Sequence, residues 1–326
     1  MSCANSDELN STNIKNSQLK KEKTIVFIAG FDEGENSYYT NAKNYFVAQK
    51  KEVIDGLYSL QEINNWLNKN SSNTNYSEIH IVSHSNAWRG ISLRTKPAGE
   101  RITTANITKV KNEIPNVENG ITANTKIIFH SCGLGENLAL LETLKTAFST
   151  KESPKIYASS FFNVFGGTYA EHYLAKPYYG YYPTAESPGP LELSKEFKSK
   201  YPDTQIDWFT ALKTRKEGHS GEVYSYKFNI PVEWEFNFND ISEIPASQDR
   251  DELLDWIAEN EELGMALFKM GIPIEKYRWK SVIKDNTLII KGKTTVLCVL
   301  EPIMRSDEVA AYRAPDVEDT SLYQIL

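Results

Sequence analysis

Short apolar runs alternate with helix-like segments over the first half of the chain. Residues 24–29 are apolar and β-branched up to Gly30, which is typical of a buried parallel strand. Ser59 stands three residues before Glu62, a capping-box pattern that opens a helix. Similar runs predict strands at 53–57, 79–82, 91–93 (an edge or hairpin strand), 125–129 and 156–158, and helices at 39–49, 60–67 and 138–148. This alternation predicts an α/β domain with a mostly parallel sheet flanked by helices.

The second half of the chain follows a different pattern. From 224 to 238 every even position is large and apolar, whereas the odd positions are polar, charged or proline. This period of two predicts a strand with one buried face, and Pro231 on the opposite face favours an edge strand or a break in pairing. An acidic helix is predicted at 250–270, and further strands at 279–283, 288–290 and 295–300. These elements predict a smaller, β-rich α+β module whose role the pattern does not reveal.

A change in composition divides the chain. Residues 178–190 are rich in aromatic residues, glycine and proline, and we place the domain boundary within them. The predicted organisation is a flexible polar tail at 1–23, an α/β domain at 24–185 and an α+β module at 186–326.

Composition and charge exclude several classes of protein. The 326 residues carry 36 Lys and Arg against 43 Asp and Glu, a formal charge of −7. Non-specific nucleic-acid binding depends on clustered cations, so this balance argues against a nucleic-acid partner. No apolar stretch approaches the roughly 20 residues of a membrane-spanning helix. Three widely spaced cysteines neither form a disulfide framework nor offer a zinc site, and we expect no metal or other cofactor. The oligomeric state stays open.

The polar segment at 1–23 lacks the apolar core of a signal peptide. One interpretation is a flexible terminus of a cytoplasmic protein, in which Cys3 is incidental. Another is a bacterial lipoprotein of the cell envelope whose signal has been removed, because such a chain begins at a cysteine followed by a polar tether. The sequence leaves both compartments open.

Chemically reactive side chains follow two of the predicted strands. The strand at 79–82 runs into a turn that contains His84, and the strand at 125–129 runs into a turn that contains Cys132. In open α/β sheets, active sites form beyond the carboxyl ends of parallel strands. We therefore expect the imidazole and the thiol to face each other across a cleft.

This pairing suits nucleophilic catalysis. A thiolate is a strong nucleophile, and a neighbouring imidazole can generate it by taking its proton. Cys132 is predicted to lie just before a helix, where the positive end of the helix dipole favours an anion. Gly133 and Gly135 would let a substrate backbone come close. The backbone N–H groups of Cys132 and Ser85 would hold the oxyanion of a tetrahedral intermediate.

The remaining histidines and cysteines have simpler interpretations. His130 lies two residues before Cys132 and is a second candidate partner for it, or a packed residue. His80 and Cys298 lie inside predicted strands, which favours a place in the core. His219 lies in a glycine-flanked loop that follows no predicted strand.

The order of these turns resembles that of the caspase-like (clan CD) cysteine peptidases, and most closely the caspase-like domain of bacterial surface adhesins. In that domain a strand ends in Ile-Ser-His-Gly, a later strand ends in Gly-Cys, and the next ends in Ala-Ser. The resemblance covers residues 24–170 of this chain. The matching segments, in the same order, are Val82-Ser83-His84-Ser85, Ser131-Cys132-Gly133 and Tyr157-Ala158-Ser159-Ser160.

The resemblance implies a thiol protease, a hydrolase of peptide or protein substrates, with His84 as general base and Cys132 as nucleophile. The family sets its specificity with a charged pocket, in which Asp32 would select lysine or arginine. Ser159 is a further candidate for substrate binding. The family's chemistry requires no cofactor. This chain departs from the family at Ser85, where the family has glycine, and the side chain would lie beside the expected oxyanion hole.

Two other functions fit parts of the pattern. Residues 83–87 are a degraded form of Gly-x-Ser-x-Gly, which would make Ser85 the nucleophile of an α/β-hydrolase-type serine esterase. That fold needs a helix directly after the serine, whereas residues 88–93 predict a turn and a strand. The second alternative is a catalytically inactive caspase-like protein that binds a partner through the β-rich module.

Overall fold

The computed structural model describes residues 21–32, 36–71, 74–148, 152–245 and 249–326 of the chain. Cys3 and residues 1–20 of the predicted tail lie outside these ranges. The first strand, β1 (Lys21–Ile28), begins three residues before the predicted start of the first domain. Within the described residues, no helix has the length and apolar character needed to cross a membrane.

A six-stranded, mostly parallel sheet forms the centre of the first half of the fold. Its strands lie in the order β14-β8-β7-β3-β1-β2, and β14 runs antiparallel to β8. The remaining pairs are parallel, which confirms the predicted α/β fold with a mostly parallel sheet. The bounds are β2 (Glu52–Asp55), β3 (Thr74–Val82), β7 (Lys126–His130), β8 (Lys155–Ser159) and β14 (Tyr323–Ile325).

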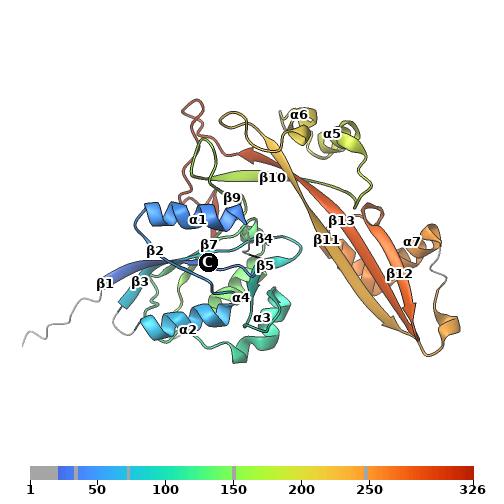
Figure 1. Ribbon diagram of the computed structural model, residues 1–326, viewed down its shortest axis with the longest axis horizontal. Coiled ribbons are helices and arrows are strands. Elements are labelled where there is room, and N and C mark those ends of the chain that lie inside the picture. The colour runs from blue at the N-terminus through green and yellow to red at the C-terminus, as the bar shows by residue number, and fades with distance from the viewer. Residues whose placement is uncertain (1–20, 33–35, 72–73, 149–151, 246–248) are drawn as a thin grey trace, which may run out of the picture.

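Helices cover both faces of this sheet (Figure 1). The helix α1 packs on one face, and α2, α3 and α4 pack on the other. The predicted helix start at Ser59 is confirmed, because the Ser59 hydroxyl accepts from the Glu62 N–H at 3.2 Å and caps α2. The bounds are α1 (Ser37–Ala48), α2 (Leu60–Asn70), α3 (Thr104–Val110) and α4 (Leu138–Phe148).

A small three-stranded sheet follows β3. It consists of β4 (Ser85–Asn86), β5 (Gly90–Arg94) and β6 (Arg101–Ile102), and β5 is the hairpin strand predicted at 91–93. Gly90 has a φ of +68°, and a Cβ there would come within 2.1 Å of the Ile102 carbonyl oxygen. Only glycine fits this turn, which holds the residues after His84 in a strand rather than a helix.

A second, antiparallel sheet lies beside the first. Its strands lie in the order β11-β13-β10-β9, and β12 pairs with the part of β13 that extends past β10. β11 is an edge strand, as Pro231 predicted. The two strands predicted at 288–290 and 295–300 are one strand, because β13 pairs with β11 without interruption. The bounds are β9 (Phe162–Phe165), β10 (His172–Pro183), β11 (Tyr224–Asn237), β12 (Arg278–Lys284) and β13 (Thr287–Pro302).

Two pairs of helices pack against the second sheet. The prediction of a single helix at 250–270 is wrong, because Asn260 has a ψ of 114° and its side chain accepts from the Leu263 N–H at 3.0 Å. Asn260 therefore ends α7 and caps α8. The bounds are α5 (Gly189–Lys200), α6 (Trp208–Lys213), α7 (Arg250–Glu259) and α8 (Glu261–Met270). Single 3₁₀ turns are η1 (Lys111–Glu113), η2 (Leu134–Glu136), η3 (Ile241–Glu243) and η4 (Ile274–Lys276).

The two sheets are interleaved along the chain. β9 and β10 come before residue 185 but belong to the second sheet, and β14 comes last but belongs to the first. Residues 178–183, which marked the predicted boundary, lie inside β10. Gly180 is needed there, because a Cβ would come within 2.3 Å of the Phe197 ring. The second sheet packs over the turn after β7, where Cys132 lies.

Candidate functional site

The turns that contain His84 and Cys132 lie side by side. Both follow neighbouring parallel strands, β3 and β7, at the same edge of the first sheet. The Ser131 hydroxyl donates to the Ser83 carbonyl at 2.8 Å, and the Ser85 hydroxyl donates to the Cys132 carbonyl at 2.8 Å. Two hydrogen bonds therefore join the turns that the sequence predicted to meet.

The His84 ring is held by α1. The Asn36 side chain caps this helix through Oδ1, which accepts from the Tyr38 N–H at 3.0 Å, and its Nδ2 lies 2.8 Å from His84 Nε2. Because an amide nitrogen only donates, Nε2 accepts and the imidazole is neutral, with its proton on Nδ1. The Tyr38 ring stacks on the imidazole with centroids 4.4 Å apart. Burial lowers the pKa of His84, which agrees with a neutral ring.

The Cys132 thiol lies in an apolar cluster. The residue is 7% exposed, and its thiol donates to the Asn163 carbonyl at 3.8 Å. Burial raises the pKa of this thiol to about 12. Among the described residues, no hydrogen bond joins this thiol to the His84 ring. The buried residues of the cluster are Cys132, Phe162, Tyr173, Ala175, Cys298 and Leu300.

The turn after Cys132 differs from the prediction in one respect. Gly133 has a φ of +68°, and a single 3₁₀ turn, η2, comes next, so that α4 begins only at Leu138. The thiol therefore lacks the α-helix dipole that we expected at this position. Gly135 is required by packing, because a Cβ there would come within 2.7 Å of the Ala158 carbonyl oxygen. Its role is to bring the turn close to β8.

A hollow of about 240 Å³ lies beside His84. We call it the histidine hollow. The small sheet and β11 form its walls, and Cys132 does not line it. Its lining residues include Asp32, His84, Ser85, Arg89, Arg101 and Asn229.

The charges of the histidine hollow include both signs. The Asp32 carboxylate accepts from the Tyr39 hydroxyl at 2.7 Å. The Arg101 guanidinium donates to the Ser92 hydroxyl at 2.7 Å. Burial and the nearby Arg89 lower the pKa of Arg101, and the Asp32 carboxylate opposes this effect. Asp32 thus lines the histidine hollow together with two cations, Arg89 and Arg101.

Ser159 lies apart from the histidine hollow. It is fully buried at the end of β8, and its hydroxyl donates to the Leu322 carbonyl at 2.8 Å. The same hydroxyl accepts from the Phe161 N–H at 3.0 Å. These contacts hold β14 against β8, so Ser159 has a structural role at this edge of the first sheet.

His130 belongs to a buried row of histidines and does not face the thiol. Its Nε2 lies 2.9 Å from His80 Nδ1, and its Nδ1 lies 3.4 Å from Asn163 Oδ1. The same amide oxygen lies 3.1 Å from His172 Nε2. His80 also lies 3.3 Å from the Glu78 carboxylate. His80 is confirmed as a buried strand residue, and Cys298 as a core residue.

Local sequence patterns did not indicate most of the residues that surround the two reactive groups. Asn36 is recognisable only as a possible N-cap before the helix predicted at 39–49. Tyr38, Asn163 and Arg101 carry no motif, and the contacts of Tyr38 with His84 and of Asn163 with Cys132 join segments far apart along the chain. Among the described residues, no group of three or more His, Cys, Asp or Glu side chains is arranged to hold a metal ion.

Comparison of the chain with family models, with curated proteins and with solved structures finds no match.

Proposed function

We propose that the chain is a caspase-like cysteine peptidase in which Cys132 is the nucleophile and His84 is the general base. The observation that carries this proposal is the hydrogen bond from the Ser85 hydroxyl to the Cys132 carbonyl, which joins the two turns. The turns follow neighbouring parallel strands, at the sheet edge where active sites of open α/β folds form. The order of the motifs along the chain agrees with this arrangement.

The proposed chemistry begins with transfer of the thiol proton to His84. The thiolate attacks the carbonyl carbon of a peptide bond, and backbone N–H groups of Cys132 and Ser85 stabilise the oxyanion. The C–N bond breaks as His84 gives the proton to the leaving amine. Water then attacks the thioester and releases the acid, which restores the thiol.

The described arrangement is a resting form of such an enzyme. With a pKa of about 12, on the order of one thiol in 10⁵ is ionised at pH 7. Phe162 of β9 and Leu300 of β13 lie in the cluster that buries Cys132. The Asn36 amide donates a hydrogen bond to Nε2 of His84, the nitrogen that would accept the thiol proton. Catalysis therefore requires that the second sheet move away from the turn, so that the thiol and the imidazole meet.

A second candidate function is a caspase-like binding protein without catalysis. The observation that favours it is the burial of Cys132 among apolar side chains of the second sheet. We do not propose a serine esterase, because Ser85 begins the strand β4 rather than preceding a helix. Its hydroxyl is also engaged with the Cys132 carbonyl.

Cleavage of a peptide library by the wild type and by Cys132→Ala tests the proposal. We expect Cys132→Ala to lose at least about 10³-fold of the activity, because the nucleophile is gone. Cys298→Ala is the matched control, since it removes a second buried thiol of the same cluster. Equal activity of the wild type and Cys132→Ala would exclude the peptidase. Stable capture of a partner by both, with no cleavage, would favour the binding protein.

A further inference from the structure

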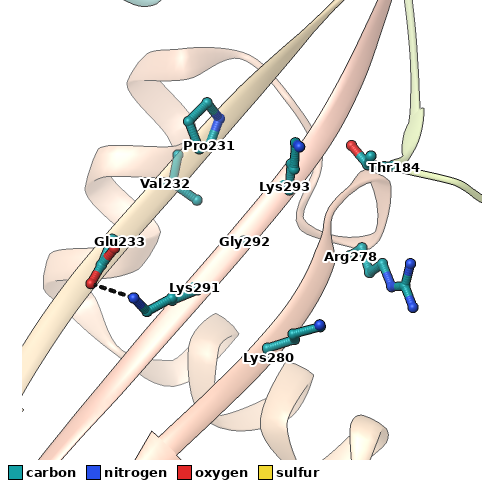
Figure 2. Close-up of a pocket in the computed structure, with 9 residues that line it drawn as sticks. All are labelled: Thr184, Pro231, Val232, Glu233, Arg278, Lys280, Lys291, Gly292 and Lys293. Atoms are coloured by element: carbon teal, nitrogen blue, oxygen red, sulfur yellow. Dashed lines mark ion pairs between the residues drawn. The ribbon is translucent and has the colours of Figure 1, made fainter.

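A second hollow, of about 510 Å³, lies on the exposed face of the second sheet. Figure 2 shows four cationic side chains that project from neighbouring strands into it or along its rim. We call it the cationic hollow. Its cations are Arg278 and Lys280 of β12 and Lys291 and Lys293 of β13.

The pairing of the strands puts these cations directly opposite one another. Arg278 pairs with Lys293, and Lys280 pairs with Lys291, in the antiparallel register of β12 and β13. Like charges in such cross-strand positions destabilise a sheet. The arrangement therefore costs stability in the free protein and is relieved when an anion lies between the pairs.

Acidic neighbours neutralise only part of this charge. The Lys291 ammonium lies 2.9 Å from the Glu233 carboxylate, and Arg278 Nε lies 3.7 Å from the Glu186 carboxylate. For Lys280 and Lys293, no ion pair is found within the described parts of the chain. The cationic hollow thus keeps a net positive charge on a chain whose formal charge is −7.

The opposite face of the same strands is covered. α7 and α8 pack on it through an apolar cluster that includes Leu253 and Leu267, together with Ile290 of β13. The helices lie behind the strands in Figure 2. Gly292 forms part of the floor, where a Cβ would come within 2.5 Å of the Trp279 ring. Because the helices take one face, the cationic face is the one free to receive a ligand.

We infer that the cationic hollow binds acidic side chains of an extended peptide. Alternate side chains of an extended peptide lie about 7 Å apart, which is also the spacing of the two cation pairs along the strands. Peptides with carboxylates at positions i and i+2 therefore fit the site best.

Binding is measured with the full chain carrying Cys132→Ala, so that no cleavage occurs. The probe is a fluorescent peptide with aspartate at alternate positions, and its partner has asparagine at the same positions. We expect the acidic peptide to bind at least 10-fold more tightly, and the difference to shrink as salt is raised. Lys280→Glu with Lys293→Glu is expected to weaken binding of the acidic peptide at least 10-fold.

A matched control changes two exposed lysines elsewhere, Lys69→Glu with Lys109→Glu on α2 and α3, and is expected to leave binding within 2-fold. The milder pair Lys280→Gln with Lys293→Gln is expected to give an intermediate loss, and circular dichroism checks that each variant folds. Equal affinity for the two peptides, or tighter binding of a single-stranded oligonucleotide, would overturn the inference. Tight peptide binding by a wild type that cleaves nothing would instead remove the peptidase and leave the binding site in place.

Discussion

The hydroxyl of Ser85 donates a hydrogen bond to the carbonyl oxygen of Cys132 at 2.8 Å. This contact joins the two turns of the candidate site. The serine side chain therefore has a structural role in this chain, which is to hold the turn that carries the thiol.

Ser85→Ala separates this role from catalysis. We expect the free energy of unfolding to fall by about 1 kcal/mol, since one partly buried hydrogen bond is lost. Peptide cleavage should stay within about 10-fold of the wild type, because the hydroxyl takes no part in the proposed chemistry. Urea titration and library cleavage measure the two effects. A complete loss of hydrolysis with an unchanged stability would instead identify Ser85 as a nucleophile.

The burial of Cys132 predicts slow alkylation of the native protein. Only the thiolate reacts with iodoacetamide, and burial raises the pKa of this thiol to about 12. At pH 8 we expect Cys132 to react at least about 100-fold more slowly in the native chain than in urea. Peptide mapping by mass spectrometry measures each cysteine separately. Rapid labelling of native Cys132 at neutral pH would show that the covered arrangement is not the resting form.

Asn36→Asp is expected to raise the pKa of His84. Aspartate preserves the helix cap, because its carboxylate still accepts from the Tyr38 N–H. It replaces the amide that now donates to His84 Nε2 by an acceptor and a negative charge, which favours the protonated imidazole. The acidic limb of the cleavage profile should therefore move to higher pH.

Asn36→Ala is the control for this change, because it removes both the cap and the amide. It should destabilise α1 by about 1 kcal/mol and raise the pKa of His84 less than Asn36→Asp does, because it removes the amide donor but adds no negative charge. NMR titration of the imidazole gives the direction of each shift independently of activity. An unchanged or lowered pKa in Asn36→Asp would contradict the contact between the amide and Nε2.

The sequence predicted the elements whose signals are local. The apolar runs that became β3 and β7 end where His84 and Cys132 follow, so the meeting of these turns was foreseen. The apolar side chains that bury Cys132 were not foreseen. Cys298 and Leu300 come more than 160 positions later in the chain and reach Cys132 only through the pairing of β13. The end of α7 at Asn260 was not predicted, because asparagine also occurs inside helices. Asn260 caps α8 only because its backbone is extended, with a ψ of 114°.

Residues 178–183 also form a structure that their local composition did not indicate. Aromatic residues, glycine and proline at 178–183 are typical of a linker, but here they form a strand between β9 and β13. Gly180 makes room for Phe197 of α5, a contact that no local pattern indicates. Long-range pairing decided the structure of this segment against its local composition.

The buried histidine row predicts that the protein loses stability in acid. Burial lowers the pKa of His80 and His130, and lowers that of His172 to about 3. The folded chain therefore binds fewer protons than the unfolded chain, whose histidines titrate near pH 6.5, about their ordinary value. The stability that these groups contribute is fully present above that pH and is lost as the pH falls below it, by about 1.4 kcal/mol per pH unit for each histidine that stays neutral in the folded chain. The lowered pKa of Glu78, caused mainly by its hydrogen bond with His80, adds a further loss below about pH 4.5.

Urea titrations at pH 7.5, 6 and 5 measure this loss, and His172→Phe identifies its source. The His172 ring stacks on Phe165 with centroids 4.1 Å apart, so a phenyl ring retains the packing and removes one titrating group. We expect His172→Phe to reduce the slope of stability against pH by about 1.4 kcal/mol per pH unit. A slope unaltered by His172→Phe would mean that the imidazole is protonated without cost, and that the row is not sealed from water.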